Sequence, residues 1–245
     1  LLASTGAVVG TYWVGSQPNG IAFDGTNIWV ANNGSGIVTK LLASTGAVAG
    51  TYWVGDQPYG IAFDGTNIWV TDSLLGTVTK LLASTGAVVG TYGVGSQANG
   101  IAFDGASIWV TNSSGGFLTK LLASTGAVVG TYWVGFLSYG IASDGTNIWV
   151  TNSNGNTVTE LQASTGAVVG TYGVGANVQG VAFDGTNIWV ANSNDNNVSK
   201  LLASTGALLG TYPVGRLPVG VAFDGTSIWV VNSGDNTVTK IGATR

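Results

Sequence analysis

The sequence predicts an all-β fold, a six-bladed β-propeller of four-stranded antiparallel blades, and three observations favour it. First, the segment Gly20–Val30, two short apolar runs around a polar turn, returns every 40 residues. Its further copies span 60–70, 100–110, 140–150, 180–190 and 220–230. Second, each repeat holds four strand-like runs separated by turns, which is the content of a propeller blade. Third, no segment has the 3.6-residue periodicity of a helix over a sufficient length.

The first repeat shows how the strands are assigned. We expect four antiparallel strands there, from innermost to outermost, at 20–24, 27–32, 37–43 and 47–54. The first two flank the polar turn 24–27 (Asp-Gly-Thr-Asn), which is typical of hairpins. Residues 28–30 (Ile-Trp-Val) are apolar in succession, so we expect neighbouring blades to cover both faces of each sheet. Because no repeat can bury such a strand alone, residues 1–245 are predicted to form one domain.

The two ends of the chain predict how the ring closes. The chain opens with an outermost strand near 7–14, and its last repeat, 221–244, holds only the three inner strands. We therefore expect 7–14 to pair with the last blade as its fourth strand. Leu1–Ser4 and Ile241–Thr244 are then equivalent pieces of one strand, so we expect Leu1–Ala3 to be frayed or differently paired.

Side chains that recur in every repeat are predicted to be structural. Because aromatic side chains bury a large area, we expect one tryptophan per repeat to be a wedge between blades: Trp29, Trp69, Trp109, Trp149, Trp189 and Trp229. The aspartate that opens each hairpin turn, Asp24 in the first repeat, is expected to accept hydrogen bonds from nearby backbone amides. The lysines, of which Lys40 is the first, also recur once per repeat and are expected to ring the molecule rather than form a patch.

The composition excludes several function classes. The chain has no cysteine and no histidine, which excludes disulfides, thiolate nucleophiles, histidine acid–base chemistry and the usual zinc sites. Seven basic and 11 acidic residues give a net charge of -4, which argues against nucleic acid as a partner. No apolar run approaches the ~18 residues of a membrane helix, so we expect no membrane insertion. With no cationic leader and no initiator Met, we expect no signal peptide and a processed segment.

The repeats differ from one another in a few segments. One is the connection that leads from each outermost strand to the next innermost strand, at 16–19, 56–59, 96–99, 136–139, 176–179 and 216–219. The loop between the second and third strands (33–37 in the first repeat) and the position of Trp13 also vary. Antiparallel strands place these segments on the same face of the ring, and the nearly constant turns on the other. We therefore expect a single variable face.

The candidate ligand site lies where the variable face meets the central channel. The residues just before the innermost strands form a mostly polar ring there: Asn19, Tyr59, Asn99, Tyr139, Gln179 and Val219. Further candidate contacts on this face are Trp13, Trp53, Trp133, Phe136 and Arg216. Aromatic and amide side chains at a concave mouth indicate a glycan, peptide or protein ligand. The alternative interpretation is drift in loops that tolerate any residue.

A polar residue also ends the second strand of each repeat near this face: Asn32, Asp72, Asn112, Asn152, Asn192 and Asn232. These side chains either cap the following turn or contribute oxygens to a ligand or to a cation, such as calcium or magnesium at the channel mouth. Asp195 and Asp235 occupy turns of adjacent blades but lack the spacing of an EF-hand loop. Since no ligand set is complete, we predict no metal-binding residue and no cofactor.

The repeat Pro-x-Gly-Ile-Ala-Phe-Asp-Gly-Thr-Asn-Ile-Trp-Val-Ala-Asn, followed by Thr-Val-Thr-Lys-Leu and Gly-Thr-Tyr-x-Val-Gly, resembles the NHL and YVTN-type propeller repeats. Bacterial proteins related to the streptogramin (virginiamycin B) lyase carry such repeats, and the resemblance covers the whole chain. It implies a propeller fold and, for the lyase, an active site with histidine, glutamate and magnesium. This chain has no histidine, and its only glutamate, Glu160, stands where other repeats have lysine, so no catalytic residue carries over.

Three hypotheses for the function follow. The favoured one is a non-enzymatic, monomeric binding module that presents its variable face to a glycan, peptide or protein. The second is a divergent metal-dependent lyase or hydrolase with oxygen ligands such as Asp72 and Asn32. The third is a structural repeat without a ligand, produced by recent amplification of one blade or by design. We favour a secreted or cell-surface bacterial protein.

Overall fold

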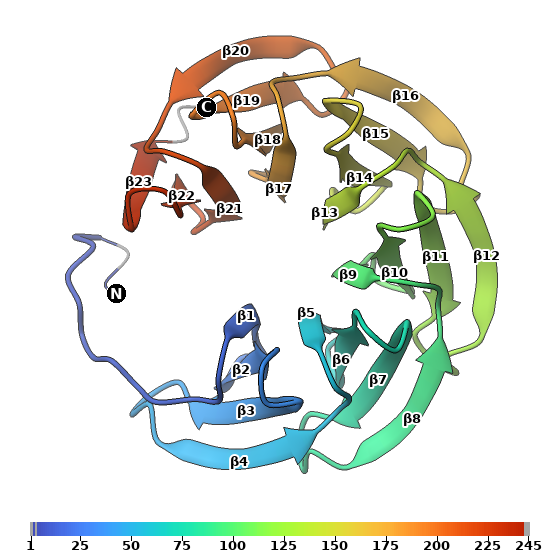
Figure 1. The fold of residues 1–245 in the computed structure, drawn as a ribbon, viewed down its shortest axis with the longest axis vertical. Helices are drawn as coiled ribbons and strands as arrows, with labels where there is room; N and C mark the ends of the chain where they lie inside the picture. Colours follow the sequence, from blue (N-terminus) through green and yellow to red (C-terminus); the bar gives the residue numbers. More distant parts are fainter. Residues whose placement is uncertain (1, 3, 243–245) are drawn as a thin grey trace.

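The structure of the chain, a computed structural model, describes residues 2 and 4–242. Within these residues the regular secondary structure consists of β-strands only. The strands form six sheets arranged in a ring (Figure 1). We number these sheets as blades 1 to 6 in chain order. No helix that could span a membrane occurs among the described residues.

The blades have the following strands. Blade 1 contains β1 (Pro18–Phe23), β2 (Asn27–Asn32), β3 (Ile37–Leu42) and β4 (Val48–Trp53). Blade 2 contains β5 (Pro58–Phe63), β6 (Asn67–Asp72), β7 (Thr77–Leu82) and β8 (Val88–Gly93). Blade 3 contains β9 (Ala98–Phe103), β10 (Ser107–Asn112), β11 (Phe117–Leu122) and β12 (Val128–Trp133). Blade 4 contains β13 (Ser138–Ser143), β14 (Asn147–Asn152), β15 (Thr157–Gln162) and β16 (Val168–Gly173). Blade 5 contains β17 (Val178–Phe183), β18 (Asn187–Asn192), β19 (Asn197–Leu202) and β20 (Leu208–Pro213). Blade 6 contains β21 (Pro218–Phe223), β22 (Ser227–Asn232) and β23 (Thr237–Gly242).

The predicted fold class is confirmed. In each blade the strands follow one another from the channel outward in chain order, and all paired neighbours are antiparallel. The predicted strands agree closely with the observed ones, and the largest difference is that β1 starts at Pro18 rather than at Gly20. The register of the innermost pair shifts once, between Pro18 and Ile21, where the chain enters the strand from the variable face.

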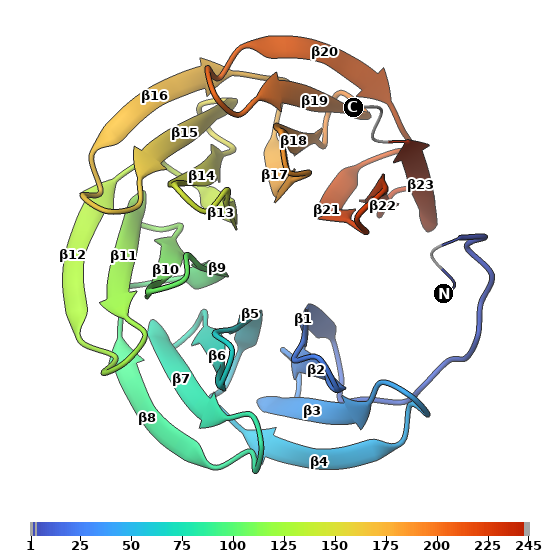
Figure 2. The ribbon, with the colours of Figure 1, turned by 180° about the vertical axis from the view of Figure 1, so that it is seen from behind.

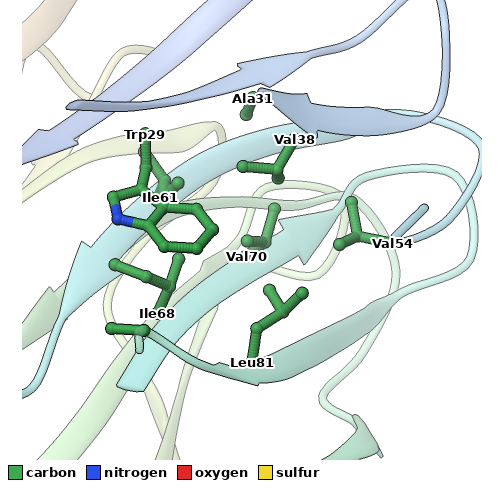
Figure 3. Close-up of a cluster of buried hydrophobic side chains, with 9 residues drawn as sticks. Trp29, Ala31, Val38, Val54, Ile61, Ile68, Val70 and Leu81 are labelled. Carbon is green, nitrogen blue, oxygen red and sulfur yellow. The ribbon is translucent and has the colours of Figure 1, made fainter. Parts of the chain in front are cut away.

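The hydrophobic core lies between blades rather than within them. Trp29 of blade 1 is fully buried in a cluster with Ile61, Ile68 and Leu81 of blade 2 (Figure 3). Trp69, Trp109, Trp149 and Trp189 occupy the same place at the following junctions. The prediction that these rings are wedges between blades is therefore confirmed at five junctions. Trp229 of blade 6 differs, since it is only partly buried.

The aspartate of each hairpin turn holds its tryptophan in place. Asp64 Oδ2 accepts a hydrogen bond of 2.7 Å from Trp69 Nε1, and Oδ1 accepts bonds from the backbone amides of Thr66 and Asn67. The same pattern recurs in the other five blades. The structural role predicted for these aspartates is thus confirmed, and the sequence did not reveal that the indole is their partner.

The lysines recur around the ring, one in each blade but blade 4, and four of them are buried: Lys40, Lys80, Lys120 and Lys200. Lys240 of blade 6 is exposed. Lys40 is buried, its Nζ donates a 2.8 Å hydrogen bond to the carbonyl oxygen of Ala83 in blade 2, and it lies 4.9 Å from the centre of the Trp29 ring. Lys80 and Lys120 make the same two contacts. The reason is that the long side chain crosses the face of the indole and reaches a turn carbonyl of the next blade, which replaces its hydration.

The predicted closure by residues 7–14 is wrong. Blade 6 has three strands, and residues 7–14 form no strand and no backbone hydrogen bond with β23 within the described part of the chain. Figures 1 and 2 show a gap between β23 and blade 1, which the N-terminal segment (residues 4–15) crosses along the outer rim. Innermost strands of successive blades contact one another from β1 to β21, but no comparable contact joins β21 to β1. The six blades therefore stop short of a full turn.

The expectation for Leu1–Ala3 falls largely outside the described residues. Leu2 is described, and its amide donates a 2.9 Å hydrogen bond to the carbonyl oxygen of Ala7. At the other end, Ile241 belongs to β23 and pairs with Ile228.

Replacing a wedge tryptophan should destabilise the fold according to its burial. Trp149→Ala removes a fully buried ring and should lower the free energy of unfolding by about 3–5 kcal/mol. Trp229→Ala removes a partly exposed ring and should cost clearly less. Urea unfolding followed by circular dichroism measures both, and equal losses would contradict the uneven burial of the two rings.

The turn aspartates should make the fold sensitive to acid. Burial alone would raise the pKa of Asp24, but hydrogen bonds from Trp29, Asn27 and Thr26 outweigh it and lower the pKa to about 2. The pKa values of Asp64 and Asp184 are lowered for the same reason. Because these values lie below the ~3.9 of an unfolded aspartate, their stabilising effect is present above about pH 4 and is lost as the pH falls through the folded-state values. The urea midpoint should therefore fall between pH 4 and pH 2, and Asp64→Asn with Asp184→Asn should flatten that fall. A double variant with the full pH dependence would contradict this assignment.

Candidate functional site

The variable segments lie together on one face of the ring. In blade 2 the amide of Ser73, in the loop between β6 and β7, donates a 3.0 Å hydrogen bond to the carbonyl oxygen of Gln57 in the preceding connection. Blade 3 has the same bond from Ser113 to Gln97. The constant turns lie on the other face, where the amide of Ala83 bonds the carbonyl oxygen of Thr66. These bonds confirm a variable face and a constant face.

The mouth of the central channel opens on the variable face. A cavity of about 490 Å³ there is lined by five of the six predicted ring residues, Asn19, Tyr59, Tyr139, Gln179 and Val219, together with Gly140, Gly180, Gly220 and Val231. The structure thus brings together residues from five blades that are far apart in the sequence. None of the side chains in this lining is charged at neutral pH.

Asn99 is the exception in the predicted ring. Its side chain is buried, and its Nδ2 donates a hydrogen bond to Ser113 Oγ of the adjacent loop in its own blade. Ser113 Oγ in turn donates a 2.7 Å bond to the carbonyl oxygen of Ser138 in the next connection. Asn99 therefore ties neighbouring segments of the variable face together and does not line the cavity.

Threonines behind the mouth fix its backbone. Thr71 Oγ1 accepts a 2.8 Å hydrogen bond from the amide of Gly60 in its own blade and donates one of 2.8 Å to the carbonyl oxygen of Asn99 in the next. Thr111 and Thr151 repeat this bridge, and the acceptors are the carbonyl oxygens of Tyr139 and Gln179. This role was not predicted from the sequence, although these threonines stand where blades 1 and 5 have Ala31 and Ala191.

The aromatic side chains of the variable face are exposed. Trp13, Trp53, Trp133 and Phe136 all present most of their surface to solvent. Trp133 and Phe136 border a cavity of about 220 Å³ with Asn152 and Thr157 of blade 4. A cavity of about 300 Å³ in blade 3 is lined by Phe117, Asn112 and several hydroxyl side chains. These hollows lie farther out on the same face as the channel mouth.

Arg216 lies at the edge of the variable face. It is exposed, and its backbone amide donates a 2.6 Å hydrogen bond to Asp235 Oδ2. Asp195 makes the equivalent bond with Ala176 in blade 5. Both carboxylates therefore join a loop to a connection, which is the role of turn caps.

The residues that end the second strands cap the loops that follow. Asn32 Nδ2 donates to Thr39 Oγ1 at 3.0 Å, and Asp72 Oδ1 accepts from the amides of Leu74 and Leu75. The buried side-chain oxygens of four members of this ring accept no hydrogen bond from the described protein atoms: Asn32, Asn112, Asn152 and Asn232. Of the two alternatives for this ring, the observed contacts favour capping. No cluster of three or more acidic residues suited to a metal ion occurs among the described residues.

Glu160 lies away from the channel mouth. It accepts 2.7 Å hydrogen bonds from Asn147 Nδ2, in a turn of the constant face, and from the Tyr172 hydroxyl. Burial raises the pKa of Glu160; the bond from Tyr172 opposes this shift, and the charge of Asp144 adds to it. Burial together with the bond to Glu160 and its charge raises the pKa of Tyr172 to about 12. The glutamate thus replaces the inter-blade lysine with a bond network inside one blade.

The fold and the mouth together define a six-bladed β-propeller with an uncharged hollow at one end of its channel. Among solved structures the chain is similar to a streptogramin B lyase, with 18% identity and a TM-score of 0.74, covering 94% of this chain and 84% of that chain. It is also similar to the selenomethionine-substituted virginiamycin B lyase from Staphylococcus aureus, with 19% identity and a TM-score of 0.78, covering 91% and 80%.

A third similar structure is the Kuenenia stuttgartiensis hydrazine synthase, with 18% identity and a TM-score of 0.59, covering 98% of this chain and 99% of that chain. No protein-family model and no curated protein matches the sequence. At these identities the likeness concerns the fold, and at that level the resemblance to lyase-like propellers is confirmed.

Removing a threonine bridge should loosen the channel mouth. Thr111→Val leaves the amide of Gly100 and the carbonyl oxygen of Tyr139 without this partner and should cost about 1–3 kcal/mol of stability. Thr131→Val, at an exposed position of β12, is the matched control and should be nearly neutral. Equal urea midpoints for the two variants would show that the bridge contributes nothing.

Proposed function

We propose that the protein is a non-enzymatic binding module whose channel mouth and variable face bind a glycan. The observation that carries this proposal is the cavity of about 490 Å³ at the mouth, built from the residues in which the repeats differ. Its volume lies within the range of ligand-binding pockets, roughly 300–1,000 Å³. A constant frame with a varied concave surface is the arrangement expected of a binding site on a repeat scaffold.

The chemistry of the lining favours an uncharged polar ligand. Asn19 and Gln179 offer amide donors and acceptors, and Tyr59 and Tyr139 offer hydroxyl groups and aromatic faces. Amides pair with sugar hydroxyls in both directions, and an aromatic ring packs against the apolar face of a sugar. A phosphorylated or strongly acidic ligand would require cations, and the lining supplies none.

The outer part of the variable face offers similar contacts. Trp133 and Phe136 are exposed and border the cavity of about 220 Å³. Exposed aromatic rings can pack against the apolar face of a sugar. An extended glycan that starts at the mouth could therefore continue over the rim of blade 4.

The metal-dependent lyase or hydrolase receives less support. The carboxylate of Asp72 caps its own loop. The amide nitrogen of Asn32 donates to Thr39, and the side-chain oxygen of Asn32 is buried away from the surface. Both carboxylate oxygens of Asp72 accept backbone amides, since Oδ2 lies 3.3 Å from the amide nitrogen of Gln57. The similarity to lyases in fold alone brings no catalytic residue to this chain.

A glycan array probed with the labelled protein tests the proposal. We expect binding to one class of neutral glycans, with at least a tenfold loss for Tyr59→Ala combined with Tyr139→Ala. Tyr59→Phe combined with Tyr139→Phe should retain part of the affinity, because the rings remain. Val89→Ala, exposed on the outer strand β8, is the control and should bind normally. Binding of peptides or proteins but of no glycan, or binding that is unchanged in the double alanine variant, would contradict the proposal.

A further inference from the structure

We propose that the gap between blade 6 and blade 1 is the docking site of one further 40-residue repeat of this chain's own type. The first strand of that repeat would complete blade 6, and its other three strands would form a blade with residues 7–14 as the outermost strand. This inference concerns the scaffold and does not rest on the proposed glycan binding, although Gly220 also lines the cavity at the channel mouth.

The glycine before each innermost strand shows that a neighbour is missing at blade 6. A Cβ on Gly100 would lie 2.1 Å from the carbonyl oxygen of Tyr139 in the next blade, and Gly20, Gly60 and Gly140 are as close to theirs. At Gly220 such a Cβ would meet only Val231 of its own blade, at 3.6 Å. Position 220 thus has the glycine that close contact with a neighbouring innermost strand requires, but no strand of the described chain lies next to it.

The two faces that border the gap are apolar, and their counterparts elsewhere are buried. On blade 1, Ile21 is 67% exposed, whereas Ile61 at the same position of blade 2 is 9% exposed. On blade 6, Val238 is 47% exposed, whereas Val198 in blade 5 is fully buried. Each face therefore matches the surface that a neighbouring blade covers at the five formed junctions.

The N-terminal segment already occupies the outer edge of the absent blade. Gly6 donates its amide to the carbonyl oxygen of Leu2, as Gly46 does to that of Leu42, so residues 4–7 lie in a turn like the one that precedes each outermost strand. Tyr12 lies against Gly46 of blade 1, since a Cβ added to Gly46 would be 2.0 Å from the Tyr12 ring. Tyr52 of β4 lies against Gly86 of blade 2 in the same way. Tyr12 is therefore in the place of an outermost-strand tyrosine of a blade preceding blade 1.

The other end of this segment reaches blade 6. A Cβ on Gly6 would lie 3.7 Å from the Trp229 ring. Residues 4–14 therefore span from blade 6 to blade 1 along the outer rim (Figure 1), and the described part of the chain places no inner strands behind them. The missing parts, one outermost strand for blade 6 and three inner strands behind residues 7–14, make up one continuous repeat.

The test is an extended chain in which residues 201–240 are duplicated after Lys240, compared with the 245-residue chain. We expect the extended chain to be monomeric by light scattering and to unfold at a clearly higher temperature. Gly220→Ala should leave the unfolding temperature of the 245-residue chain unchanged and lower that of the extended chain by roughly 5 °C, because the added methyl group then meets the new blade. Gly100→Ala should lower both, which makes it the matched control.

Three results would overturn the proposal. If Gly220→Ala destabilises the 245-residue chain as strongly as Gly100→Ala, the six blades close on themselves in solution. If the 245-residue chain dimerises and the extended chain does too, a second copy rather than a repeat covers the gap. If Gly220→Ala does not change the unfolding temperature of the extended chain, the added repeat does not dock against blade 6.

Discussion

The junction between successive blades is the contact on which the rest of this structure depends. At each formed junction a buried tryptophan fills the space between two sheets, and an aspartate fixes the orientation of its indole. At the first three junctions a lysine crosses the tryptophan ring to a carbonyl oxygen of the next blade. At all five formed junctions a glycine allows the innermost strands to approach closely. Because one contact set recurs, each blade stands in the same relation to its neighbour, as expected of a repeat scaffold.

This constraint divides the molecule into two unequal faces. The hairpin turns that carry the aspartates lie on the constant face, so a change there would disturb the tryptophan and with it the junction. The connections and loops of the other face are held mainly by backbone hydrogen bonds, which are insensitive to side-chain identity. The variable face can therefore change its chemistry while the ring remains intact, and the channel mouth lies at its centre.

Much of the fold could be predicted because repetition supplies comparisons that a single copy lacks. The strands, the wedge tryptophans and the common face of the variable segments all follow from what recurs and what differs. The place of the lysines could not be predicted, since a once-per-repeat lysine has the same pattern whether it faces water or the next blade. The way in which the ring closes also could not be predicted, because the length of a repeat does not determine the angle between neighbouring blades. For that reason 7–14 was assigned to blade 6 although Tyr12 contacts blade 1.

The candidate site was predictable in outline but not in detail. The location directly before an innermost strand was sufficient to predict which residues meet at the channel mouth: Asn19, Tyr59, Tyr139 and Gln179. Asn99 has the same position, yet Ser113 beside it offers a hydroxyl partner and turns the amide inward. The direction of a side chain depends on such local partners, which the alignment of repeats does not show.

Hydrogen exchange of the backbone amides tests most directly whether the junctions hold the ring together. Strands with a blade on both sides, such as β10 and β14, should exchange slowest, through nearly global unfolding. Strands β22 and β23 should exchange faster, and residues 7–14 should be close to unprotected. Equal protection of β23, residues 7–14 and β10 would show a ring closed by its N-terminal strand and would contradict the open junction.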